Sequence, residues 1–468
     1  MAREITADEK QLAADMLARG RRAMERIAHY TQEDVDRVAR AIGWATANEK
    51  TFTRLAHMGV DESGLGDREG RPAKRFKIIG VLRDALRGKS VGVIEELPEK
   101  GIVKYAKPAG VIASLIPTTN PALTPPVTAI YALKCKNAVI FSPHPRAKKT
   151  TNEMVSIMRR QLEKIGAPAD LLQCVESPSI PLTNELMSIC DLTMATGGAP
   201  MVRAAYSSGK PAYGVGAGNS TIVIDETADI EQAAQNTRTS KLSDFGSGCS
   251  ADGNMLIDAK IYDAMLEALR AEGGYLCSEE EKRKLKGALW DDEGARKIDT
   301  VAVPAARIAE AAGFAVPEST RFLIVRQDKI GKEHFFSKEK LSVTLAVYKY
   351  ETFDQALEMV RQIYEVGGKG HSCGIYSHSD ENIDRLARVA PVSRMMVRQP
   401  QSKANAGSFT NGMPMTSSLG CGIWGGNITN ENISLKHYMN VTWVSRPIPE
   451  DRPSDEELFG EFYNTETM

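Results

Sequence analysis

Ala109-Gly-Val-Ile-Ala-Ser-Leu-Ile-Pro117 is an apolar run that ends at a proline. A run of this kind, with almost no polar alternation, is typical of a strand that is buried on both faces of a parallel sheet. Similar runs follow it, and helix-like stretches alternate with them. The strands expected in the first half are residues 109–117, 137–142, 171–175, 189–195 and 221–225, separated by helices that include 124–134, 149–165 and 201–208. This alternation predicts a doubly wound α/β fold.

The alternation continues after residue 250 and predicts a second α/β domain. Its expected strands are 254–258, 321–325, 344–350, 373–376 and 394–397, and its expected helices are 262–271, 353–363 and 382–390. Apolar residues at helical spacing before residue 60 predict two or three amphipathic helices. Residues 438–444 form an isolated strand-like run, which often pairs with a neighbouring subunit.

Composition narrows the class of protein. The 468 residues are 42% hydrophobic and 25% charged, as in ordinary soluble globular proteins, and the net charge of −1 provides no positive field for nucleic acid or acidic membranes. The N-terminus has no apolar core of a signal peptide, and no stretch is long and apolar enough to span a bilayer. The seven scattered cysteines form no CxxC pair, which favours reduced thiols in a cytoplasm and disfavours zinc.

One cysteine has an unusual setting, in the run Ser247-Gly248-Cys249-Ser250. Glycine beside it removes bulk from the approach to the thiol, and a thiolate is the strongest ordinary side-chain nucleophile. Cys249 is therefore a candidate nucleophile. The alternative is a buried structural thiol, which is the more common role of a cysteine.

Two glycine clusters and one asparagine lie near strand ends. Ala195-Thr-Gly-Gly-Ala-Pro200 lies where a strand becomes a helix, so it forms either a tight turn or a cradle for a pyrophosphate. Gly214-Val-Gly-Ala-Gly-Asn219 suits either a turn or bulge, or backbone that passes under a flat ligand. Asn120 precedes a proline, as in many turns, but its amide could also donate to an oxyanion.

Together these segments resemble the aldehyde dehydrogenase superfamily, in its CoA-acylating branch. The resemblance runs from about residue 110 to 440 and rests on the segments at 140–149, 195–198, 204–211, 214–219, 339–342, 370–371 and 419–427. It implies an α/β aldehyde dehydrogenase fold with a Rossmann-like parallel-sheet cofactor domain, an α/β catalytic domain and a small oligomerisation element. The implied domains are residues 1–230, completed by part of 425–468, for the cofactor, 231–425 for catalysis, and 434–468 for oligomerisation.

The resemblance also implies a reaction. Cys249 would add to an aldehyde, and Asn120 and the backbone N–H of Cys249 would hold the oxyanion. Hydride transfer to NAD or NADP would leave a thioester. Hydrolytic relatives have a Glu-Leu-Gly-Gly segment whose glutamate activates water, but this chain has Val215-Gly-Ala-Gly218 there. Without that carboxylate, coenzyme A would take the acyl group.

The cofactor residues implied by the resemblance surround these segments, with Glu339 placed at the nicotinamide ribose. Basic residues without an acid at 142–149 suit the 2′-phosphate of NADP, or else form the solvated first turn of a helix, so the choice of NAD or NADP stays open. The complete implied set is Pro117, Thr118, Ser142, His144, Pro145, Arg146, Thr196, Gly197, Gly198, Val215, Gly216, Glu339 and Leu341.

The expected substrate residues are Arg398, Lys403 and His371. Relatives that use acetaldehyde have an asparagine in place of Arg398, and an arginine there suits an aldehyde with a sulfonate or carboxylate. The acylating sulfoacetaldehyde dehydrogenases are the most similar relatives in this respect. Alternatively, Arg398 forms a rim salt bridge or contacts a CoA phosphate.

Other readings of the whole chain stay open beside this one. They are an acylating enzyme for acetaldehyde or propionaldehyde, a hydrolytic dehydrogenase, and a structural relative without catalysis. The expected partners are a small aldehyde, CoA and further copies of the chain in a homodimer or homotetramer, with neither nucleic acid nor membrane.

Overall fold

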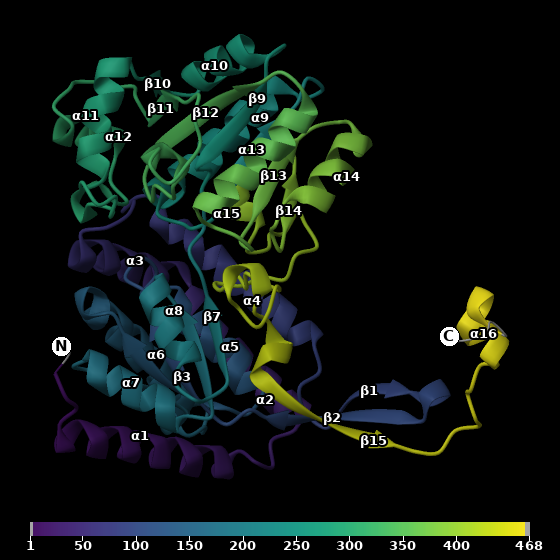
Figure 1. Ribbon diagram of the computed structural model, residues 1–468. Helices are drawn as coiled ribbons and strands as arrows, with labels where there is room; N and C mark the ends of the chain where they lie inside the picture. The colour runs from purple at the N-terminus through teal and green to yellow at the C-terminus, as the bar shows by residue number, and fades with distance from the viewer. Residues whose placement is uncertain (1–2, 464–468) are drawn as a thin grey trace.

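The computed structural model describes residues 3–463. Two parallel sheets with flanking helices form two lobes, and a third, small sheet projects from them (Figure 1). The first parallel sheet has the strand order β5-β4-β3-β6-β7. Its strands are β3 (Val111–Ile116), β4 (Ala138–Pro143), β5 (Leu172–Cys174), β6 (Leu192–Thr196) and β7 (Ala212–Val215). The predicted α/β fold with parallel sheets is confirmed.

Helices cover both faces of this five-stranded sheet. The helices between its strands are α5 (Thr124–Lys134), α6 (Lys148–Lys164), α7 (Ile180–Ile189) and α8 (Ala199–Tyr206). α5 is buried along its whole length, and prolines occupy its first turn, where the missing N–H leaves no hydrogen bond unmade.

The predicted amphipathic helices before residue 60 are present. α1 (Ala7–Arg26) contacts α7 and the strands β3 and β4, whereas α2 (Gln32–Ala47) contacts α5 and α6. These contacts place α1 and α2 on opposite faces of the sheet. α3 (Glu49–Ser63) and α4 (Arg75–Arg87) complete this N-terminal layer.

The second parallel sheet has seven strands, in the order β10-β11-β12-β9-β8-β13-β14. They are β8 (Thr221–Ile224), β9 (Asn254–Asp258), β10 (Gly274–Leu276), β11 (Phe322–Arg326), β12 (Thr344–Tyr350), β13 (Cys373–Tyr376) and β14 (Met395–Val397). Its helices are α9 (Ile230–Leu242), α10 (Tyr262–Ala271), α11 (Glu279–Leu289), α12 (Ala305–Ala311), α13 (Phe353–Val366), α14 (Asp380–Val389) and α15 (Gln401–Ala404).

One strand belongs to a different sheet from the one expected. The run at 221–225 was expected to be the fifth strand of the first sheet, but β8 pairs with β9 and β13 of the second sheet. β7 takes the fifth place instead. Two short apolar runs five residues apart look alike in a sequence, and only their pairing separates them. The chain therefore passes from one sheet to the other at residues 216–220, before the expected domain boundary at 230.

The third sheet is antiparallel and consists of β1 (Val93–Leu97), β2 (Ile102–Pro108) and β15 (Met439–Ser445). Figure 1 shows that it projects from the two lobes, with α16 (Asp455–Phe459) beyond it. The run at 438–444 is thus a strand, as expected, but it is not isolated, because it pairs with β2 of the same chain. No helix within residues 3–463 combines the length and apolar character that a membrane crossing requires.

Candidate active site

The candidate site lies where the two lobes meet. Parallel strands run in one direction, so residues 216–220 lead from the carboxyl edge of the first sheet to the amino edge of the second. A Cβ on Gly218 would lie 1.9 Å from the carbonyl oxygen of Cys249. Only glycine allows this approach of two backbone segments. The glycine cluster at 214–219 therefore allows residues 216–220, which link the two sheets, to pack against the loop that carries the thiol of Cys249.

Cys249 and His371 form a pair at the amino edge of the second sheet. Cys249 lies in the loop before β9, and His371 precedes β13. The Sγ atom of Cys249 is 3.0 Å from Nε2 of His371, and Nδ1 of His371 is 2.8 Å from Oγ of Ser372. Arg394 donates a hydrogen bond of 2.7 Å to the backbone oxygen of His371. His371 was expected among the substrate residues, and the structure places it against the thiol itself.

Both members of this pair are neutral in the site at pH 7. Burial raises the pKa of the Cys249 thiol to about 12, with a further contribution from the charge of Glu339. Burial, with the nearby charge of Arg394, lowers the pKa of His371 to about 3. A neutral imidazole that donates from Nδ1 to Ser372 has a free lone pair on Nε2. The histidine is therefore placed to accept the thiol proton.

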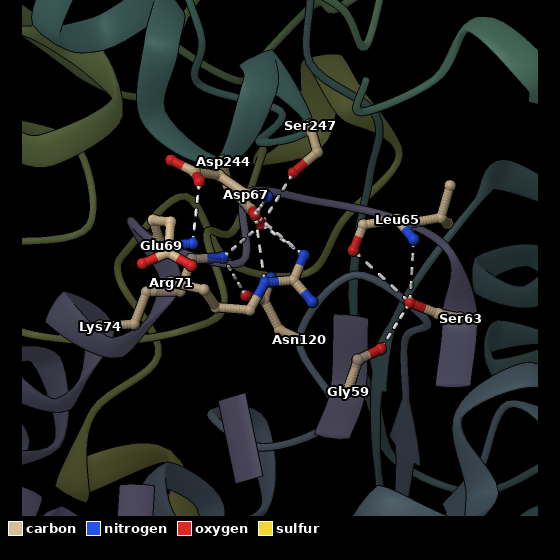
Figure 2. Close-up of polar contacts among 10 residues, drawn as sticks. All are labelled: Gly59, Ser63, Leu65, Asp67, Glu69, Arg71, Lys74, Asn120, Asp244 and Ser247. Atoms are coloured by element: carbon tan, nitrogen blue, oxygen red, sulfur yellow. Dashed lines mark hydrogen bonds and ion pairs between the residues drawn. The ribbon is translucent and has the colours of Figure 1, made fainter. Parts of the chain in front are cut away.

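Asn120 is held by a network of charged side chains that Figure 2 shows. Nζ of Lys74 donates to Oδ1 of Asn120 at 2.6 Å and to Oδ2 of Asp244 at 2.7 Å. Asp244 also forms an ion pair of 2.8 Å with Arg71 and accepts a hydrogen bond of 3.1 Å from the hydroxyl of Ser247. This one carboxylate therefore links Asn120 at the end of β3 to the loop of Cys249.

Sequence reasoning missed Lys74, Arg71 and Asp244. The stretch 237–244 reads as a continuous helix, but α9 ends at Leu242 and Asp244 has a φ of 53°. A non-glycine residue at positive φ is strained, and no sequence pattern predicts it here. Lys74 and Arg71 come from a short helical turn, Arg71–Lys74, which is distant in the sequence and carries no motif.

Most of the predicted cofactor residues lie at the carboxyl edge of the first sheet. The strand order reverses between β3 and β6, and such a switch point is where open α/β sheets bind nucleotides. A Cβ on Gly216 would make only ordinary van der Waals contact, with Sγ of Cys421 at 3.8 Å. α8 begins directly after Gly198, so its first N–H groups point to the same edge. The residues that this edge brings together, at the ends of β3, β4, β6 and β7, are Pro117, Thr118, Ser142, Thr196, Gly197, Gly198, Val215 and Gly216.

His144 and Arg146, which follow β4, are already engaged in contacts within the chain. Nδ1 of His144 accepts from the backbone N–H of Arg146, with Pro145 between them, and the Arg146 guanidinium donates to the backbone oxygen of Ser63 at 2.7 Å. The expectation of bases without an acid is incomplete, because Glu62 of α3 accepts hydrogen bonds from the first turn of α6, at 2.8 Å from the N–H groups of residues 149 and 150. Glu62 is too distant in the sequence to be linked to this helix without the structure.

Glu339 lies beside the thiol loop. Its Oε1 atom accepts a hydrogen bond of 3.1 Å from the N–H of Gly218, and burial raises its pKa to about 7. Leu341 lies two residues further on at a φ of 46°, where it packs against a small apolar cluster of Leu65, Val301 and Ala302. The structure thus brings Glu339 to Gly218, whereas the side chain of Leu341 packs where residue 65 of the first lobe meets residues 301 and 302 of the second.

Arg398 and Lys403 lie at opposite edges of the second sheet. Arg398 follows β14 at the carboxyl edge, and its guanidinium donates to the backbone oxygen of Ser377. The structure therefore does not bring Arg398 to Cys249, which lies at the amino edge. At Arg398 the backbone has a φ of 51° and the chain turns back. The backbone N–H of Ser402 then donates a hydrogen bond to Oγ of Ser240 on α9, and Lys403 lies close enough to Asp244 to feel its charge.

The site combines a thiol with a neighbouring base, and it lies between a sheet edge of the nucleotide-binding type and a second α/β lobe. This arrangement is typical of two-domain dehydrogenases that work through a cysteine. The comparisons identify the family. Residues 4–301 match the model of the aldehyde dehydrogenase family. The chain belongs to the aldehyde dehydrogenase family, as the sequence motifs predicted.

Individual relatives within this family allow a closer comparison. The chain is 45% identical to a sulfoacetaldehyde dehydrogenase of Acholeplasma sp, over 95% of this chain and 93% of the relative. It is 41% identical to an acylating sulfoacetaldehyde dehydrogenase of Bilophila wadsworthia, over 96% of this chain and 98% of the relative. The crystal structure of an acetylating aldehyde dehydrogenase from Geobacillus thermoglucosidasius matches 96% of this chain and 99% of its own, with a TM-score of 0.91 and 34% identity. The predicted aldehyde dehydrogenase fold is thereby confirmed.

Proposed function

We propose that the protein is a CoA-acylating aldehyde dehydrogenase that converts an aldehyde with an anionic group, in the first place sulfoacetaldehyde, to its acyl-CoA with NAD(P)+ as oxidant. The observation that carries this proposal is the pair of Cys249 and His371, at the junction between a nucleotide-binding type of sheet edge and the second lobe. The acylating relatives support the reaction class. They also support sulfoacetaldehyde as the substrate.

In the first half of the reaction, Sγ of Cys249 attacks the aldehyde carbon while Nε2 of His371 accepts the thiol proton. The amide of Asn120 and the N–H of Cys249 donate to the oxyanion. Bound at the carboxyl edge of the first sheet, NAD(P)+ would supply the acceptor for the hydride of this adduct. The acyl group then remains on Cys249 as a thioester.

In the second half, the thiol of CoA replaces Cys249. Residues 215–218 contribute no carboxylate that could activate water against the thioester. Glu339 is close, but its carboxylate is bound to the N–H of Gly218. His371 first releases the proton of Cys249 to solvent, as the proton that the overall oxidation produces. It then accepts the proton of the CoA thiol, the thiolate attacks the acyl carbon, and the departing sulfur of Cys249 takes this proton back from His371. One thioester is exchanged for another, so the reaction is reversible.

Lys403 supports an anionic substrate. Lys403 is exposed, and among residues 3–463 no side chain forms a hydrogen bond or ion pair with its ammonium group, whose charge acts on the half-buried Lys74 and Lys77. The charge of Asp244 is already engaged by Arg71 and Lys74. An unpaired ammonium at this place can bind the sulfonate or carboxylate of an aldehyde whose carbonyl lies at Cys249.

The test is a substrate panel of sulfoacetaldehyde, succinic semialdehyde, acetaldehyde and propionaldehyde, each with NAD+ or NADP+ and with or without CoA. We expect sustained NAD(P)H formation only with CoA, and the highest kcat/KM with sulfoacetaldehyde. Steady release of free acid without CoA at a similar rate would instead identify a hydrolytic dehydrogenase. No turnover of any aldehyde would favour a structural relative.

Lys403 is tested by Lys403→Met, with Arg398→Met as the matched control. We expect Lys403→Met to lower kcat/KM for sulfoacetaldehyde by about 10–100-fold, the usual effect of removing one partner of a charged contact. It should change kcat/KM for propionaldehyde little. Arg398→Met removes the same charge at the far edge of the sheet and should leave both values within about 3-fold. Equal losses on both aldehydes would exclude Lys403 as the anion ligand.

Oligomerisation and cellular location complete the proposal. Exposed apolar residues on the outer strand β15, at Val441, Trp443 and Val444, support a homodimer or homotetramer in which a second copy covers the projecting sheet. Light scattering should then show a multiple of the 51.1 kDa chain, and a monomer would contradict it. The seven cysteines, all free thiols in the structure, support a reducing, cytoplasmic setting.

A further inference from the structure

We infer that Lys74 is a positioning residue that orients and polarises the carboxamide of Asn120 for the oxyanion of the reaction. This inference rests on the proposed function, in which Asn120 donates to that oxyanion. It is carried by the contact between Nζ of Lys74 and Oδ1 of Asn120, 2.6 Å long, at the junction of the two lobes (Figure 2).

The contact decides which end of the amide is available. An ammonium group only donates hydrogen bonds, so the Asn120 atom that it touches must be the carbonyl oxygen. The NH2 group is then the other end of the amide. No partner within residues 3–463 accepts a hydrogen bond from this NH2 group, and Asn120 is half-buried at the end of β3. Lys74 thus leaves the donor end of the amide free for a ligand.

The contact also strengthens that donor. A positive charge on the carbonyl oxygen draws electron density from the amide nitrogen and makes its N–H groups better donors, and the effect is larger in a medium of low polarity. Burial lowers the pKa of Lys74, and the charge of Asp244, 2.7 Å away, opposes this shift. Asp244 therefore helps to keep the ammonium charged where it acts.

Asp244 extends this control to the nucleophile. It accepts hydrogen bonds from Lys74 and from the hydroxyl of Ser247, which lies two residues before Cys249. It sits at a strained positive φ, which the ion pairs with Arg71 and Lys74 stabilise. The oxyanion donor comes from the first lobe and the thiol from the second, and this carboxylate connects the lysine that holds the donor to the loop that carries the thiol.

A double-mutant cycle tests the inference. The variants are Lys74→Met, Asn120→Ala and both together, and the rate of the NAD(P)H burst is measured in single turnovers with saturating propionaldehyde, whose neutral chain does not involve Lys403. We expect Lys74→Met to lower this rate by about 10–100-fold, somewhat less than the loss of a whole oxyanion donor. In the Asn120→Ala background, the same change should lower it by less than about 3-fold, because Lys74 acts through Asn120.

Three further measurements separate positioning from a general structural role. Lys74→Gln keeps a neutral donor to the carbonyl oxygen, so it should recover part of the rate, and it replaces the methionine variant in the cycle if that variant does not fold. Arg75→Met removes the adjacent charge, whose guanidinium contacts Glu49 and the Ala47 carbonyl, and should leave the rate unchanged. Iodoacetamide should alkylate Cys249 at the native rate in Lys74→Met.

Two outcomes would overturn the inference. One is additivity, with the same loss from Lys74→Met whether or not Asn120 is present. The other is an alkylation rate that falls in parallel with the burst, which would mean that Lys74 acts on the thiol loop instead. Failure of the proposed function is distinguishable from both, because the native protein would then form no acyl-CoA from any aldehyde of the panel.

Discussion

Replacement of His371 by asparagine should change both the rate of acylation and its dependence on pH. In the native site, Nε2 of His371 is 3.0 Å from the thiol of Cys249, where the proposed mechanism has it accept the thiol proton during attack. Burial raises the thiol pKa to about 12, so without the imidazole the thiolate is scarce at neutral pH.

The expected magnitude follows from the loss of a general base. His371→Asn should lower the rate of the NAD(P)H burst by about 100- to 10,000-fold at pH 7.5. Its remaining rate should rise about tenfold for each unit of pH, since the thiolate must then form with hydroxide. The native rate should not fall between pH 8 and pH 6 because of this residue, since burial keeps the pKa of His371 at about 3 and the imidazole stays neutral.

The assay is a stopped-flow measurement of the burst between pH 6 and pH 9, with His334→Asn as control. His334 is paired with Glu333 on the surface and should behave like the native protein. A His371→Asn variant with a tenth of the native rate or more would refute the role of His371 as the base. A slow variant whose rate does not increase with pH would also refute it, because the thiol would then not limit the reaction.

Two further changes test the structure around the site. Asp244→Asn removes the charge that pairs with Arg71 and Lys74, and it should lower the free energy of unfolding in urea by about 3–5 kcal/mol, as for other broken buried ion pairs. The control Asp61→Asn, at an exposed ion pair, should change this free energy by less than about 1 kcal/mol. A loss of under about 1 kcal/mol for Asp244→Asn would show that the network does not stabilise the fold. Gly218→Ala places a Cβ 1.9 Å from the carbonyl oxygen of Cys249, so residues 216–220 must move. The rate of the NAD(P)H burst should then fall at least about 100-fold, while the helix content measured by circular dichroism is preserved. Near-native activity would disprove the close approach of the two backbone segments.

The predictable part of the fold is the part with strong periodicity. Residues 262–271, 344–350 and 373–376 were expected with the bounds that α10, β12 and β13 have in the structure. β1 and β2 were not expected, since their charged residues on an exposed, projecting sheet hide the apolar pattern. The strand at 221–225 was assigned to the wrong sheet because pairing, unlike strand propensity, depends on distant segments.

The candidate site also contains residues that the sequence predicted and residues whose positions only the structure shows. Motifs singled out Cys249, Asn120 and Glu339, and the structure brings all three to the junction of the lobes. Arg398 was also singled out, but it directly follows β14 and lies at the carboxyl edge, whereas a turn at positive φ returns the chain with Lys403 toward the amino edge. A motif identifies a residue type and its neighbours along the chain, but not the direction in which a loop leaves a strand.

The amino-acid sequence by itself determined the α/β class and the family, and it singled out the candidate thiol. These depend on local patterns, since burial on both faces of a strand and a glycine beside a cysteine can be read over a few residues. Only the tertiary structure decided that His371 lies against Cys249 and that Lys74 and Asp244 hold Asn120. Those contacts join segments 46 to 170 residues apart, and their energies arise from burial and charge, which exist only after the two lobes have packed together.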